Sequence, residues 1–270
     1  MTTRPLSLAA ITVLELSPPE MVACAAAAGF SHVGLRLVPA TANEPTWPAI
    51  GDTPMVGEIA HRLEGTGVRA LDIEIFRLKP DTEVRAYLPA LDTGARLGAM
   101  HVLVAGNDPD EARLTERFAA LCELCAPLRL TCNLEPMPWT EVKNLQQGAR
   151  IVAAARQPNA GVLIDPIHFD RAGNVPADIA AVPRERLHYA QLCDAPAARP
   201  RDMETVLHQA RAERLMPGDG GLDLARILRA LPPGLPLALE IPMQTLAKTV
   251  PAIERARRIR AKTEAFLASL

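Results

Sequence analysis

Short hydrophobic runs alternate with longer amphipathic segments along almost the whole chain. Such runs are typical of strands buried on both faces, and the longer segments repeat their apolar residues at helical spacing. The runs predict eight strands: Leu6–Thr12, Ser31–Leu37, Val68–Phe76, Met100–Ala105, Arg129–Glu135, Ala160–Asp165, Leu187–Leu192 and Pro236–Ile241. The predicted helices are Pro18–Ala28, Pro54–Glu64, Asp81–Leu97, Asp110–Cys125, Asn144–Arg156, Ala177–Ala181, Met203–Ala212, Leu222–Leu231 and Leu246–Leu270.

Regular alternation of strand and helix indicates parallel strands joined by crossover helices. Eight such units in 270 residues favour a single closed (β/α)₈ TIM barrel, one domain spanning residues 1–270. The alternative, an open doubly wound sheet, requires a glycine-rich phosphate turn after the first strand. The segment from Thr12 to Ser17 contains no glycine, so the barrel is the preferred prediction.

Composition narrows the classes of partner. With 29 Lys and Arg against 31 Asp and Glu, the net charge of −2 gives no general attraction to nucleic acid or to an anionic membrane. No apolar run reaches membrane-spanning length. The five cysteines show no zinc-finger spacing, so we expect buried free thiols in a reducing compartment. These features predict a cytoplasmic protein with a small-molecule substrate.

The stretch from Gly161 to His168 carries the strongest chemical signal. Its apolar run leads directly into Asp165, a proline follows, and His168 lies three residues after the carboxylate. Parallel α/β folds place their chemistry at the carboxyl ends of strands. For one such stretch alone, an Asp that merely caps a turn is the simpler explanation.

Polar residues at three further strand ends strengthen the functional interpretation. Glu135 closes the fifth predicted strand, Gln191 lies in the seventh and Glu240 in the eighth. In a barrel these side chains and Asp165 would converge on one mouth. Carboxylates packed together repel and raise one another's pKa, and a hard divalent cation removes that repulsion. The pattern therefore predicts a metal site of carboxylate and amide oxygens.

Motifs along the chain resemble one known family. They are Ala27–Gly34, Leu134-Glu135-Pro136-Met137-Pro138, Asp165-x-x-His168, Gln191–Pro196, Pro217-Gly218-x-Gly220 and Leu239–Glu240. In this order they resemble the sugar phosphate isomerase/epimerase group of xylose-isomerase-like TIM barrels. The resemblance implies that Glu135, Asp165, Gln191 and Glu240 bind one divalent metal. Mn²⁺ or Mg²⁺ is expected, with Zn²⁺ or Co²⁺ as alternatives.

The resemblance also has a finer component and two departures. Ketose epimerases of the group have His at the position of Gln191. The 3-dehydroshikimate dehydratase branch has Gln there, as this chain does. Phe76–Arg77 is likewise shared with that branch. Arg36, however, stands where many members have Glu, and Cys193 where Lys or a polar residue is common. These departures argue against a standard sugar pocket.

The metal site suggests roles for individual side chains. Glu135 and Glu240, on opposite sides of a bound hydroxy ketone, are candidate bases, and His168 is a candidate acid or base. The alternative for His168 is a turn histidine bonded to a backbone carbonyl. The candidate substrate-binding residues are Arg77, Arg36, Arg214 and Trp139.

The leading functional hypothesis is a metal-dependent isomerase or epimerase of a small keto-sugar or polyol acid. The alternative is a lyase of the 3-dehydroshikimate dehydratase type, acting on a cyclic hydroxy keto acid, and a third is a non-catalytic sugar-binding barrel. A DNA-repair endonuclease of the same superfamily would need more clustered histidines and a basic groove. By analogy with similar proteins, we expect a homodimer or homotetramer.

Overall fold

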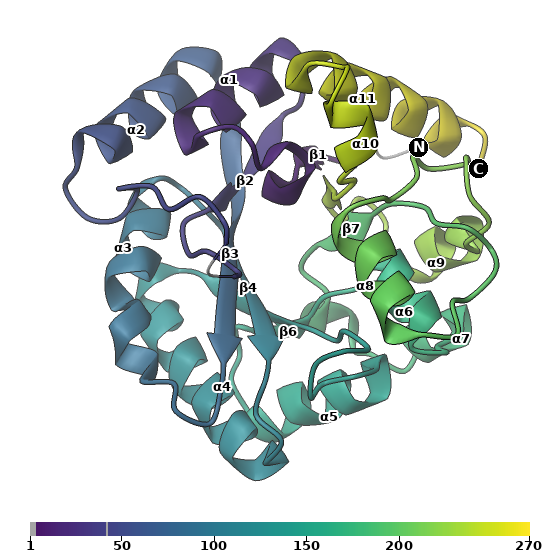
Figure 1. The fold of residues 1–270 in the computed structure, drawn as a ribbon. Coiled ribbons are helices and arrows are strands. Elements are labelled where there is room, and N and C mark those ends of the chain that lie inside the picture. The colour runs from purple at the N-terminus through teal and green to yellow at the C-terminus, as the bar shows by residue number, and fades with distance from the viewer. Residues whose placement is uncertain (1–3, 42) are drawn as a thin grey trace.

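The computed structural model describes residues 4–41 and 43–270 and contains one curled, parallel, eight-stranded sheet (Figure 1). The strand order is β6-β5-β4-β3-β2-β1-β8-β7, and a parallel bridge between Ile164 and Ala190 joins the two ends. This closure confirms the predicted (β/α)₈ barrel. The strands are β1 (Leu6–Leu8), β2 (His32–Arg36), β3 (Arg69–Leu78), β4 (His101–Gly106), β5 (Thr131–Glu135), β6 (Ala160–Val162), β7 (Ala190–Leu192) and β8 (Leu237–Leu239).

Helices surround the barrel on the outside (Figure 1). The longer ones are α1 (Pro18–Ala27), α2 (Pro54–Thr66), α3 (Leu88–Arg96), α4 (Glu111–Cys125), α5 (Leu145–Ala155), α8 (Met203–Arg211) and α11 (Ala252–Ala268). Shorter helices are α6 (Pro166–Arg171), α7 (Pro176–Ile179), α9 (Leu224–Ala230) and α10 (Gln244–Ala247). Four 3₁₀ turns complete the described chain: η1 (Ala10–Val13), η2 (Val84–Tyr87), η3 (Ala126–Leu128) and η4 (Arg184–Arg186).

Local sequence explains where many helices begin. A capping box at Ser17 and Glu20 opens α1, with prolines in its first turn. Asp110 and Asn144 accept hydrogen bonds from the first backbone N–H groups of α4 and α5. At the end of α2, Gly67 adopts a left-handed φ of 72°, which a residue without Cβ tolerates best.

Several predicted elements are shorter or divided; the sixth, seventh and eighth strands, for example, are shorter than predicted. The first strand ends at Leu8, because the chain then turns so that the Thr12 hydroxyl donates to Leu239 O on β8. The predicted helix 81–97 begins only at Leu88, with Pro89 in its first turn. The terminal helix is divided before Ala252, since Pro251 lacks the N–H that a continuous helix would need.

The core has two parts. A large cluster fills the layer between the sheet and the surrounding helices, and it includes the buried thiols Cys122, Cys125 and Cys132. A smaller cluster fills the barrel interior, and its residues alternate along the strands with those of the large cluster. It includes Leu71, Leu103, Leu163 and Tyr189. All five cysteines are buried and free, in agreement with the prediction.

Among the described residues, no helix combines the length and hydrophobicity needed to cross a membrane.

Candidate metal and substrate site

A pocket of about 680 Å³ opens at the carboxyl ends of the strands. Its wall includes Glu135 at the end of β5, Glu240 after β8, and Glu74 and Arg77 in the last part of β3. This is the face of a TIM barrel on which catalytic side chains meet. The pocket is also large enough to enclose a small ligand.

Four buried side chains form a candidate metal site in this pocket. One ligand atom from each of Glu135, Asp165, His168 and Glu240 lies within 4.8 Å of the others. Gln191 is adjacent, and its Nε2 donates a hydrogen bond of 2.8 Å to Glu240 Oε1. The structure thus brings together all four predicted metal ligands and adds His168 to them.

The position of His168 follows from the way Asp165 begins a helix. Asp165 is the N-cap of α6, where its Oδ1 accepts the backbone N–H of Ile167 at 2.9 Å. His168 therefore lies in the first turn of α6, directly above the strand end. Its Nε2 is 3.6 Å from Glu135 Oε1 and 3.7 Å from Asp165 Oδ2. Asp165 both caps the turn and belongs to the acidic cluster.

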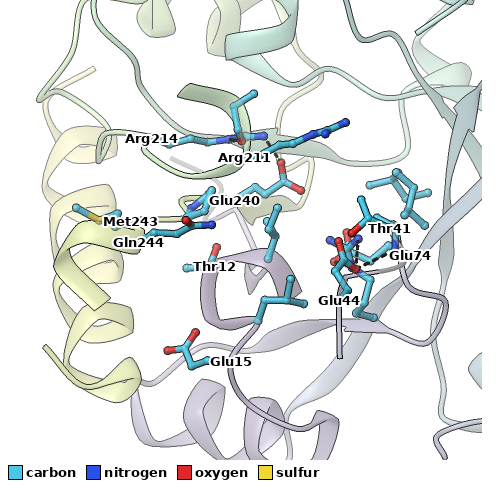
Figure 2. A pocket seen from close by; sticks show the side chains of 18 of the residues that line it. Thr12, Glu15, Thr41, Glu44, Glu74, Arg211, Arg214, Glu240, Met243 and Gln244 are labelled. Atoms are coloured by element: carbon cyan, nitrogen blue, oxygen red, sulfur yellow. Dashed lines mark hydrogen bonds and ion pairs between the residues drawn. The ribbon is translucent and has the colours of Figure 1, made fainter. Parts of the chain in front are cut away.

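Arg214 occupies the centre of the cluster rather than its rim. Its Nη1 lies 2.6 Å from Asp165 Oδ2 and its Nη2 lies 2.5 Å from Glu240 Oε2. Its Nε donates to Ala210 O at 2.7 Å, and Cys193 Sγ is 3.4 Å from Nη1. Figure 2 shows Arg214 beside Glu240, with Arg211 next to it. The sequence predicts Arg214 as a substrate-binding residue, whereas in the structure two carboxylates match its charge.

Burial and the charges within this cluster raise the pKa of some of its members and lower that of others. Burial, together with the charges of Glu240 and Asp165, raises the pKa of Glu135 well above its ordinary value. Burial also raises the pKa of Glu240 to about 8, although Arg214 opposes the shift. Burial acts the same way on Asp165, but Arg214 and His168 outweigh it and lower its pKa to about 2. Burial lowers the pKa of His168 to about 4.

The residues present fit a hard divalent cation. Glu135 Oε1 and Gln191 Oε1 are buried and have no hydrogen-bond partner among the described residues. Unpartnered buried oxygens are costly, and both lie beside the acidic cluster. The donor set is rich in carboxylate and amide oxygens, with one imidazole, and contains no thiolate. Three carboxylates and one guanidinium leave two negative charges for a doubly charged ion to balance.

The other predicted substrate residues have different environments. Arg77 and Trp139 line the pocket as expected. Arg36 also reaches it, but its Nε is 3.5 Å from Glu74 Oε1 and its Nη1 is 3.5 Å from Glu44 Oε2. The charge of Arg36 is therefore already compensated within the protein. Figure 2 shows Glu44 and Glu74 together on this side of the pocket.

Sequence reasoning missed Arg211, which also lines the pocket. It ends α8, three residues before Arg214. Arg214 lies beyond the end of α8, so helical spacing gives no signal that the two arginines share one pocket.

The Pro-Gly-x-Gly motif has a structural explanation. The carboxylate of Asp194 accepts backbone N–H groups of Gly218, Gly220 and Leu222 at 3.0, 3.0 and 3.1 Å. A Cβ at Gly220 would lie 2.3 Å from Asp194 Oδ1, so the close approach requires glycine. The antiparallel bridge between Asp194 and Leu215 anchors the same loop next to Arg214. Asp194 thereby holds Arg214 in position.

Comparison with known proteins identifies related chains and folds. Residues 22–264 match the xylose isomerase-like TIM barrel family. A 3-dehydroshikimate dehydratase from Pseudomonas aeruginosa is 32% identical over 143 residues, which are 51% of this chain and 22% of that protein. The chain therefore spans about a fifth of the length of this curated relative.

Solved structures share the fold at low sequence identity. The IOLI protein with a bound zinc atom has a TM-score of 0.80 at 16% identity, covering 98% of both chains. D-allulose 3-epimerase from Methylomonas sp. in complex with D-allulose has a TM-score of 0.69 at 16% identity, covering 100% of this chain and 98% of that chain. These similarities agree with the barrel fold of this chain.

Proposed function

We propose that this chain, which belongs to the xylose isomerase-like TIM barrel family, is a metal-dependent lyase that removes water from a small cyclic hydroxy keto acid. A substrate of the 3-dehydroshikimate type fits this description. The observation that carries the proposal is the buried pair of His168 and Glu135, 3.6 Å apart within the acidic cluster. Gln191 beside the cluster and the similarity to a curated dehydratase support the same choice.

Glu135, Asp165, Gln191 and Glu240 would hold the cation, with His168 within reach of it. When bound, such a cation polarises a substrate carbonyl and stabilises the negative charge that develops on its oxygen. Arg214 keeps Asp165 and Glu240 oriented towards the pocket through its two ion pairs.

The proton transfers fall to His168 and Glu135. Because burial lowers the pKa of His168 to about 4, its imidazole is neutral near pH 7 and can accept the proton next to the carbonyl. Glu135 is close enough to exchange that proton with His168 and to deliver it to the departing hydroxyl, which leaves as water. Trp139 packs edge-on against the His168 ring, with ring centroids 4.8 Å apart, and restricts its orientation.

A second candidate function is isomerisation or epimerisation of a keto-sugar. One observation favours it: Glu135 and Glu240 reach the cluster from β5 and from the end of β8, so they approach a ligand from different directions. Two bases placed in this way could remove a proton from one face of a carbon and return it to the other.

Turnover with each substrate class separates the two candidates. We expect metal-loaded protein to convert 3-dehydroshikimate to 3,4-dihydroxybenzoate, which absorbs in the ultraviolet, and chelated protein and Glu240→Gln to be inactive. Ketoses incubated in deuterated water should incorporate no deuterium. Deuterium exchange into a ketose without formation of the aromatic product would instead support the epimerase.

A further inference from the structure

Two arginines in the pocket differ from the rest in having no carboxylate partner. Among residues 4–41 and 43–270, neither Arg77 nor Arg211 forms an ion pair within 4.0 Å, although both line the pocket. Arg36 and Arg214, in contrast, are each paired with two carboxylates. The charges of Arg77 and Arg211 are therefore available to a ligand.

Neutral groups hold both arginines in place. Arg77 donates from Nε to Ala40 O at 3.1 Å and from Nη1 to Asn107 Oδ1 at 3.0 Å. The guanidinium carbon of Arg211 lies 5.4 Å from the centre of the Trp139 ring. Such contacts fix a guanidinium without neutralising its charge.

The carboxylate of Glu44 is near these arginines but is already engaged. It accepts the backbone N–H of Ala40 at 2.8 Å and forms the ion pair with Arg36. Both contacts are made by Glu44 Oε2, and no ion pair within 4.0 Å joins Glu44 to Arg77 or Arg211, although its charge partly offsets the lowering of the pKa of both arginines.

The two free cations also repel each other. Burial lowers the pKa of Arg77, and the charge of Arg211 lowers it further. Like charges in a half-buried wall are unfavourable unless an anion lies between them. Trp139 Nε1, which is buried and has no partner among the described residues, adds an unused donor nearby.

We propose that Arg77 and Arg211 form an anion subsite that binds the carboxylate of the substrate, with Trp139 supporting Arg211. The choice of carboxylate rests on the proposed lyase function, and a phosphate would use the same donors. Guanidinium groups bind either oxyanion through charge-assisted, often bidentate hydrogen bonds. Trp139 contacts both Arg211 and His168, so a bound anion would orient the ring of the substrate relative to His168.

Matched ligand pairs test the subsite by calorimetry on Mn²⁺-loaded protein. 3,4-Dihydroxybenzoate and catechol differ only in the carboxylate, and D-fructose 6-phosphate and D-fructose differ only in the phosphate. We expect 3,4-dihydroxybenzoate to bind at least about tenfold more tightly than catechol, the effect of one charge-assisted hydrogen bond. In Arg77→Gln and in Arg211→Gln, the ratio of the two affinities should fall towards one.

The controls separate this inference from the proposed function. The exposed Arg201→Gln should keep the full preference, and catechol should bind all variants equally, which shows that they are folded. A preference confined to the sugar phosphate pair, and lost in both variants, would support the subsite but contradict the lyase. No preference in either pair, or one that survives in both variants, would overturn the subsite.

Discussion

Arg214 donates from Nη1 to Asp165 Oδ2 at 2.6 Å, inside a group of carboxylates that is otherwise suited to a metal ion. Both side chains are almost fully buried. A buried guanidinium at this point supplies one of the positive charges that the acidic cluster requires, and a bound cation would supply the others.

Replacing Arg214 should therefore destabilise the metal-free protein most. Arg214→Met leaves Asp165 and Glu240 without their counter-charge, and we expect a loss of about 3–5 kcal/mol of unfolding free energy in EDTA. In Mn²⁺ the loss should be smaller, because the cation compensates the same carboxylates. Urea unfolding measures both values. Arg113→Met, which breaks the ion pair between the part-exposed Arg113 and the buried Asp108 outside the acidic cluster, is the control, and its effect should not depend on metal. An equal loss for Arg214→Met with and without Mn²⁺ would contradict this account.

Substitutions of Gln191 and of His168 should have different effects on metal binding. Gln191→Leu removes an oxygen of the proposed ligand set, so we expect Mn²⁺ affinity to fall at least about tenfold. His168→Asn should keep most of the affinity but lower kcat by about 10²–10⁴, as expected for a lost acid–base group. Calorimetry and turnover measured on the same preparations test this. The reverse pattern would make His168 the ligand and Gln191 the dispensable residue.

Metal binding should depend on pH through Glu240. Its pKa of about 8 in the metal-free protein lies above the ordinary 4.5, so a cation must displace a proton to bind its carboxylate. Affinity for Mn²⁺ should rise between about pH 6 and about pH 8 and then level off. The same raised pKa means that the metal-free protein loses stability as pH rises from 4.5 to about 8. Calorimetry across this range measures the affinity, and a flat profile would be inconsistent with a buried Glu240 ligand.

Asp194 should be a structural residue rather than a metal ligand. Asp194→Asn replaces an acceptor of several backbone N–H groups by a side chain with one acceptor oxygen, so we expect a loss of about 1.5–3 kcal/mol. Denaturant unfolding measures the loss. Asp223→Asn, at the exposed N-cap of α9, is the matched control and should change little, since Asn caps helices as well as Asp. A variant as stable as the control would show that the loop does not depend on this carboxylate.

The sequence predicted the barrel and the meeting of Glu135, Asp165, Gln191 and Glu240, because strand ends in a closed parallel sheet must share one face. It could not show that Arg214 would lie among them. That position depends on the Asp194–Leu215 bridge, a contact between a strand end and a distant loop.

The same reason explains the environment of the other arginines. The sequence predicts Arg36 as a substrate-binding residue and does not show its ion pair with Glu44, which approaches from a loop without regular structure. Arg77 has no carboxylate partner because its contacts are neutral. The sequence gives no signal for Arg211, because its contact, Trp139, belongs to the loop after β5. The periodicity of a strand predicts where its backbone lies in the sheet. It does not predict which groups a long side chain will contact, because those groups come from distant parts of the chain.

The central claim is that one divalent cation binds at the carboxyl ends of the barrel strands. Its most direct test is a calorimetric titration of chelator-treated protein with Mn²⁺, repeated on the double variant Glu135→Gln/Asp165→Asn. We expect one Mn²⁺ per chain for the natural sequence and none for the double variant at the same concentrations. No binding to the natural sequence, or the same stoichiometry in the double variant, would contradict the claim.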